Sequence, residues 1–190
     1  MMPDPEKQRA QNEAKLFAEG IRVPFYELNS DGGYVVDGDN LPVLDHTTAA
    51  IPFELPAAGG GSFVYTPDES SGHLLIYVIP TTSGPNTLQQ LNKLSGYVED
   101  LRSAGIETVG VSCESLESLA GVNLDLKLNL SLLADADREF TTAYGCNTAD
   151  MEFPQRTMIG LGPGGSVVFY SRGFAYATTA AIKKAFGLAD

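Results

Sequence analysis

Cysteine and histidine are the side chains most able to act as nucleophiles, bases or metal ligands, and this chain has only two of each. Cys113 directly follows the run 106–112, which has the residues of a buried strand, and Cys146 follows Gly145. If that run is a parallel strand, Cys113 lies at its carboxyl end, the edge where α/β proteins usually bind ligands. A lone cysteine is more often a small buried apolar residue than a reactive group. Thiol chemistry at Cys113 and a Cys113–Cys146 redox pair therefore remain open alternatives.

The two histidines and the glycine-rich stretch 162–165 give weaker indications of function. His46 could act as a general base if the N-terminal segment folds over a pocket, whereas His73 precedes an apolar run and is typical of a structural residue. Neither histidine has acidic or sulfur partners at metal-ligand spacing, so we expect no metal site. The glycine-rich stretch 162–165 lacks the lysine and helix of a phosphate loop, and the sequence indicates no cofactor.

These candidates depend on elements that alternate regularly from residue 62 onward. Apolar runs bounded by turn residues predict strands, and apolar residues at helical spacing predict helices. We expect strands at 62–66, 73–79, 106–112, 130–134, 156–161 and 166–170, the last two joined as a hairpin. We expect helices at 4–19, 86–104, 114–120, 137–144 and 177–186.

This alternation predicts an α/β fold with a mixed, mainly parallel central sheet and one antiparallel partner. The stretch 21–58 contains four prolines and the turn-forming pairs Gly32-Gly33 and Asp37-Gly38. We interpret residues 1–49 as a helix followed by an irregular extension, and residues 50–190 as one domain.

Composition restricts the partners. The chain carries 24 Asp and Glu against 12 Lys and Arg, a net charge of −12. Such a surface repels phosphate backbones and anionic lipids, so we expect neither nucleic acid nor a membrane surface as a partner. No apolar run approaches the roughly 20 residues needed to cross a bilayer, and residues 1–19 lack the apolar core of a secretory signal. A cytoplasmic location is the expectation.

Four stretches, in order, resemble the peroxiredoxin family, the redoxins and alkyl hydroperoxide reductase–thiol-specific antioxidant proteins. They are 74–80, 105–112 (Gly-Ile-Glu-Thr-Val-Gly-Val-Ser), 132–145 (Leu-Leu-Ala-Asp-Ala-Asp-Arg-Glu-Phe-Thr-Thr-Ala-Tyr-Gly) and 154–170. The likeness covers roughly residues 50 to 188. It implies a thioredoxin-like sandwich, with the N-terminal part as an extension.

In that family the active-site loop reads Pro-x-x-x-Thr-x-x-Cys and ends at a helix N-terminus. The matching span here runs from Pro80 to Thr87, so the resemblance places Gly84 at the threonine position and Thr87 at the cysteine position. The family's partner arginine corresponds to Arg156. Peroxide reduction needs a thiolate, which a threonine hydroxyl cannot supply, and ordinary cysteine peroxidase activity is therefore not expected.

Three functional hypotheses follow from the resemblance. In the first, a remodelled pocket binds or converts a small, possibly anionic molecule, with Thr87 and Arg156 at its centre and Pro80, Ser83, Gly84 and Asn86 around them. The second is a thiol oxidoreductase or peroxidase that acts through Cys113 or Cys146. The third is a non-catalytic interaction protein, and a homodimer is expected. The first requires Thr87 to lie at the start of a helix within reach of the Arg156 guanidinium.

Overall fold

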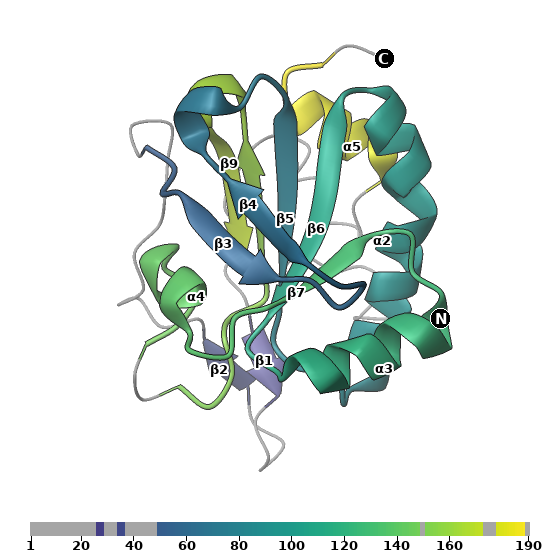
Figure 1. Cartoon of the computed structure of the whole chain (residues 1–190). Coiled ribbons are helices and arrows are strands. Elements are labelled where there is room, and N and C mark those ends of the chain that lie inside the picture. Colours follow the sequence, from purple (N-terminus) through teal and green to yellow (C-terminus); the bar gives the residue numbers. More distant parts are fainter. Residues whose placement is uncertain (1–25, 29–33, 37–48, 149–150, 173–177, 189–190) are drawn as a thin grey trace, which may run out of the picture.

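Five strands form one mixed sheet at the centre of the protein (Figure 1). The computed structural model describes residues 26–28, 34–36, 49–148, 151–172 and 178–188. The sheet has the order β7-β6-β5-β8-β9. Its members are β5 (His73–Ile79), β6 (Ile106–Ser112), β7 (Ser131–Ala134), β8 (Thr157–Leu161) and β9 (Val167–Arg172). Strand β8 is antiparallel to both of its neighbours and the other pairings are parallel, which confirms the predicted mainly parallel sheet.

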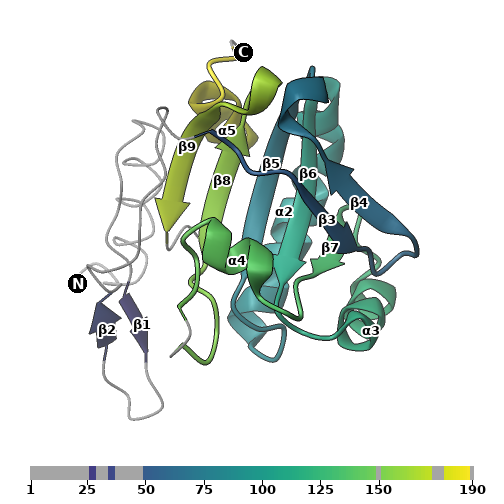
Figure 2. The same ribbon diagram turned by 60° about the vertical axis from the view of Figure 1, so that its left-hand side comes forward.

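Both faces of the sheet are covered (Figure 2). Helices α2 (Pro85–Ser103), α3 (Leu116–Leu126) and α5 (Thr179–Ala185) contribute to the apolar cluster on one face. On the other face lie the antiparallel hairpin β3 (Phe53–Pro56) and β4 (Ser62–Tyr65) and helix α4 (Glu139–Ala143). The remaining elements are β1 (Tyr26–Leu28), β2 (Tyr34–Val36) and the 3-10 turns η1 (Pro67–Glu69) and η2 (Pro163–Gly165).

Strand β5 shows why a continuous apolar run predicts a central strand. Every residue from Leu74 to Ile79 is at most 3% exposed. Successive side chains of a strand point to opposite faces, so Leu75, Tyr77 and Ile79 enter the cluster beneath α2, while their neighbours enter the cluster beneath α4. The strand ends at Ile79, and Pro80 follows it between the layer of α2 and the layer of α4.

Two predicted helices differ from the observed ones. Helix α3 begins later than expected and is longer, because Ser115 caps it by accepting a hydrogen bond from the Ser118 amide and Lys127 ends it in the left-handed conformation. Helix α4 is shorter than expected, because Arg138 adopts φ 60° and interrupts the helical path. The Asp135 carboxylate instead accepts hydrogen bonds from two amides in the first turn of α4, those of Phe140 and Thr141.

Two sequence predictions concern residues outside those that the structure describes, namely the helix at 4–19 and the base role of His46. Among the described helices, none is both long enough and apolar enough to span a membrane.

Candidate functional site

The centre of the candidate site is the first turn of α2, which the loop after β5 leads into. Gly84 is the N-cap and Pro85 the first residue of the helix, a position where proline's missing N–H costs nothing. Thr87 lies in this first turn and is only 3% exposed. Arg156, directly before β8, donates from Nη2 to Thr87 Oγ1 at 3.3 Å. The resemblance predicted that Thr87 lies within reach of the Arg156 guanidinium, and the two side chains are in contact in the structure.

The other residues expected around the pocket lie on the same loop and turn. Pro80 is buried at the end of β5, Ser83 is exposed, and Gly84 is partly exposed. Asn86 is the second residue of α2. The loop is internally bonded: the Ser83 amide donates to Thr81 Oγ1, and the Thr87 and Leu88 amides both donate to the Gly84 carbonyl.

Glu114 is a member of this site that sequence analysis missed. Its Oε2 accepts from the Thr82 amide at 2.8 Å, and its Oε1 accepts from the Thr82 hydroxyl at 2.9 Å. The Ser112 hydroxyl also donates to Oε2, at 3.1 Å. The carboxylate therefore ties the loop before α2 to the end of β6. A carboxylate directly after Ser112-Cys113 at a strand end was the signal available in the sequence, but its partner is 32 residues away.

A second missed residue lies one helical turn after Thr87. Gln90 is 6% exposed and its Oε1 accepts from the Tyr77 hydroxyl at 2.5 Å. Positions three apart on a helix share a face, so Thr87 and Gln90 both point toward the sheet. Only the helical spacing from Thr87 could have indicated Gln90.

Cys113 belongs to a different environment. Its Sγ lies 3.4 Å from Thr141 Oγ1 of α4, on the face of the sheet opposite α2. Burial raises the pKa of the Cys113 thiol above its usual value, and the nearby carboxylates of Asp135 and Glu114 raise it further. The hydrogen bond to Thr141 and the charge of Arg138 act in the opposite direction but do not outweigh burial. This environment favours the thiol over the reactive thiolate.

Cys146 lies in the interior, whereas His73 is partly buried. Cys146 is fully buried; its Sγ donates to the Tyr144 carbonyl and lies 3.7 Å from the Tyr170 hydroxyl. Both cysteines are free thiols. His73 begins β5, and its ring makes an edge contact with Phe186 at 5.1 Å between centroids. Within the described ranges, no three His, Cys, Asp or Glu side chains form a cluster able to hold a metal ion.

Comparison with known proteins gives one family match. The model of the AhpC/TSA family matches residues 47–170. A putative peroxiredoxin of Mycobacterium tuberculosis is 33% identical over 93 residues, which cover 49% of this chain and 59% of that protein. The match thus spans about three fifths of the length of this relative.

Solved structures agree in fold. The crystal structure of the peroxidoxin BcpB from Mycobacterium tuberculosis superposes with a TM-score of 0.63 at 17% identity, covering 74% of this chain and 92% of that one. AhpC of Enterococcus faecalis gives a TM-score of 0.66 at 16% identity, covering 74% and 89%. Both likenesses concern the arrangement of strands and helices.

Proposed function

Because the chain belongs to the AhpC/TSA family, whose model matches residues 47–170, we propose that it is a member in which Thr87 replaces the peroxide-reducing cysteine. In this proposal the former peroxide pocket binds a small molecule that carries a carboxylate or similar oxyanion. Arg156 supplies the positive charge, Thr87 supplies a hydroxyl, and Pro80, Ser83, Gly84 and Asn86 surround them.

One observation carries the proposal: the hydrogen bond from Arg156 Nη2 to Thr87 Oγ1, in the first turn of α2. Because Arg156 donates, the Thr87 oxygen is the acceptor and its own O–H is directed elsewhere, where it can donate to a ligand. A guanidinium and a helix N-terminus both favour an anion nearby, and planar guanidinium groups match carboxylate geometry. Arg156 is partly exposed, so a ligand can approach it from solvent.

The same residues argue against peroxide reduction at this site. In that reaction a thiolate attacks one peroxide oxygen and becomes a sulfenic acid. A threonine hydroxyl is far too weakly acidic to ionise near neutral pH and has no oxidised form of this kind. We therefore expect the unmodified chain to consume no peroxide through Thr87.

The thiol alternative has less support. The raised pKa of Cys113 disfavours its thiolate, and its contact is with Thr141 of α4 rather than with Thr87 or Arg156. Cys146 is fully buried among apolar residues, where thiols are usually inert.

A non-catalytic interaction protein is the second candidate, and the internal bonding of the loop favours it. The Thr82, Ser83, Thr87 and Leu88 amides all donate to acceptors within the protein, so these donors are not available to stabilise an oxyanion. Under this alternative the fold pairs with a second copy. Sedimentation of the full chain over a range of concentrations would detect the expected homodimer.

Two experiments test the proposal. The first follows acetate binding by NMR, with acetamide as the uncharged probe of the same shape. We expect acetate to bind more tightly than acetamide, and Arg156→Lys to weaken acetate by about tenfold, since lysine keeps the charge but loses the planar fork. Arg102→Lys, on the far end of α2, serves as the matched control. Equal binding of the two probes contradicts the proposal and favours the interaction protein.

The second experiment measures peroxide consumption with excess dithiothreitol for the wild type and for Cys113→Ser, Cys146→Ser and Thr87→Cys. We expect an inert wild type and a gain of activity in Thr87→Cys, because the introduced thiol lies beside Arg156 at a helix N-terminus. A wild type whose activity is lost in Cys113→Ser would instead establish the thiol alternative.

A further inference from the structure

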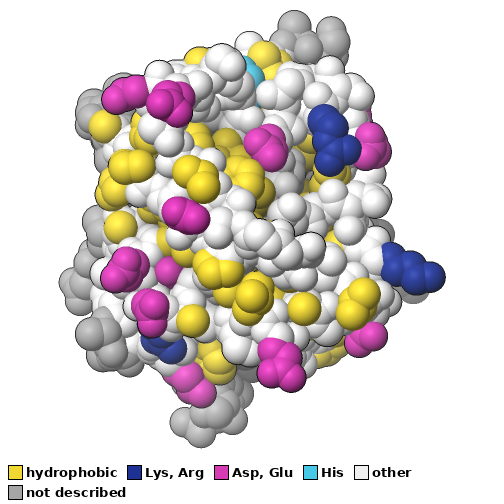
Figure 3. Space-filling view, in the orientation of Figure 1, with side chains coloured by type: hydrophobic (Ala, Val, Ile, Leu, Met, Phe, Trp, Pro, Cys, Tyr) yellow, Lys and Arg dark blue, Asp and Glu magenta, His cyan; other side chains and the backbone are white. Residues whose placement is uncertain are grey.

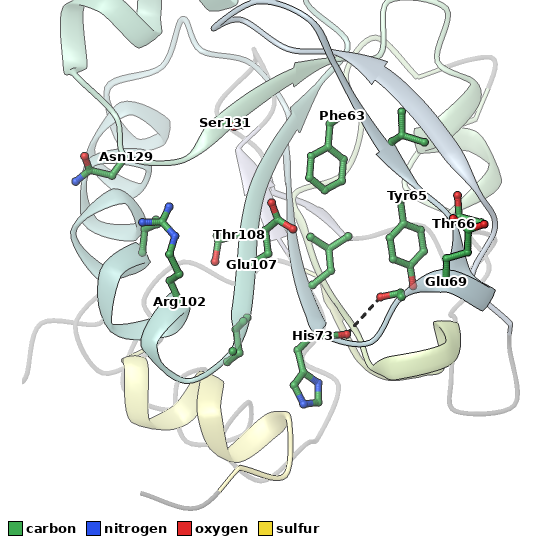
Figure 4. A pocket seen from close by; sticks show the side chains of 17 residues that line it. Phe63, Tyr65, Thr66, Glu69, His73, Arg102, Glu107, Thr108, Asn129 and Ser131 are labelled. Carbon is green, nitrogen blue, oxygen red and sulfur yellow. Dashed lines mark hydrogen bonds between the residues drawn. The ribbon is translucent and has the colours of Figure 1, made fainter.

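We draw no further inference here: the strongest candidate, the open groove between β4 and the first half of β6 on an acidic face of the molecule (Figure 3 and Figure 4), carries nothing, because the Thr108 hydroxyl, which is buried without a hydrogen-bond partner among the described residues, faces the α2 side of β6, opposite Glu107 and Phe63, and nothing in the structure shows what covers the groove.

Discussion

Glu114 gives the sharpest prediction about stability, because one carboxylate holds the loop before α2 through three hydrogen bonds. Glu114→Gln keeps the length of the side chain and one carbonyl oxygen, which can still accept from the Thr82 amide. The Gln amide can in turn donate to the Thr82 hydroxyl, since a hydroxyl rotates to accept or donate. Only the charge of the acceptor is lost, and we expect a cost of about 1 kcal/mol.

Glu114→Met should cost considerably more. Methionine is similar in length but accepts no strong hydrogen bond, so the amide and hydroxyl of Thr82 lose their acceptor. Thr82 is 7% exposed, and water cannot readily replace the missing oxygen. A buried unsatisfied donor costs about 1–3 kcal/mol. Glu114 is only partly buried, so solvent weakens its charged hydrogen bonds, and we expect the whole substitution to cost about 3 kcal/mol rather than the sum of three fully buried charged hydrogen bonds.

The assay is urea unfolding of the full chain, with amide exchange at Thr82 as a local readout. The matched controls are Glu117→Gln and Glu117→Met at an exposed position of α3, which should each change the free energy of unfolding by less than about 0.5 kcal/mol. If Glu114→Met costs no more than Glu117→Met, or leaves exchange at Thr82 unchanged, the carboxylate does not hold the loop.

Two further predictions concern groups on the α4 side of the sheet. Tyr144→Phe should lower the free energy of unfolding by about 2 kcal/mol, because the hydroxyl donates to the Ile51 carbonyl at 2.7 Å and accepts from the Ile51 amide at 3.0 Å. A cost equal to that of Tyr97→Phe, at a partly exposed position of α2, would contradict this. In a Cys146→Ser background, the rate of alkylation of Cys113 should keep rising with pH where an ordinary thiol is already ionised, because burial raises the pKa of Cys113. Thr141→Val should raise this pKa further, because it removes a hydrogen bond that favours the thiolate. A rate that levels off at the pH of a free thiol would refute the second prediction.

Much of the fold could be predicted from the sequence because the information is local. The run 73–79 and the run 106–112 coincide with β5 and β6. The first is almost continuously apolar from Leu74 to Ile79, and a stretch of this kind and length suits a strand that is covered on both faces. The boundaries of α3 and α4 could not be predicted in this way. They depend on the Ser115 cap and on Asp135, whose carboxylate accepts the amides of residues five and six positions later.

Some residues of the candidate site could likewise be predicted, and others could not. The proximity of Thr87 and Arg156 could be expected from the resemblance to a family, which supplies the three-dimensional neighbours that sequence spacing does not. The roles of Glu114 and Gln90 could not, because their partners Thr82 and Tyr77 are 32 and 13 residues away and neither spacing has a local signature.

The hydrogen bonds within the loop also determine which groups at the proposed pocket are available to bind an anion. The Thr87 and Leu88 amides donate to the Gly84 carbonyl, and Glu114 accepts the Thr82 amide, so most of the backbone donors around the first turn are already engaged. A ligand at this position must therefore depend on side chains, chiefly the Arg156 guanidinium and the Thr87 hydroxyl. Loss of either one should then reduce oxyanion binding much more than loss of Glu114, whose bonds shape the loop without facing the ligand. If Glu114→Gln reduced oxyanion binding as much as loss of Arg156 or Thr87, the backbone amides of the loop would instead be the groups that bind the anion.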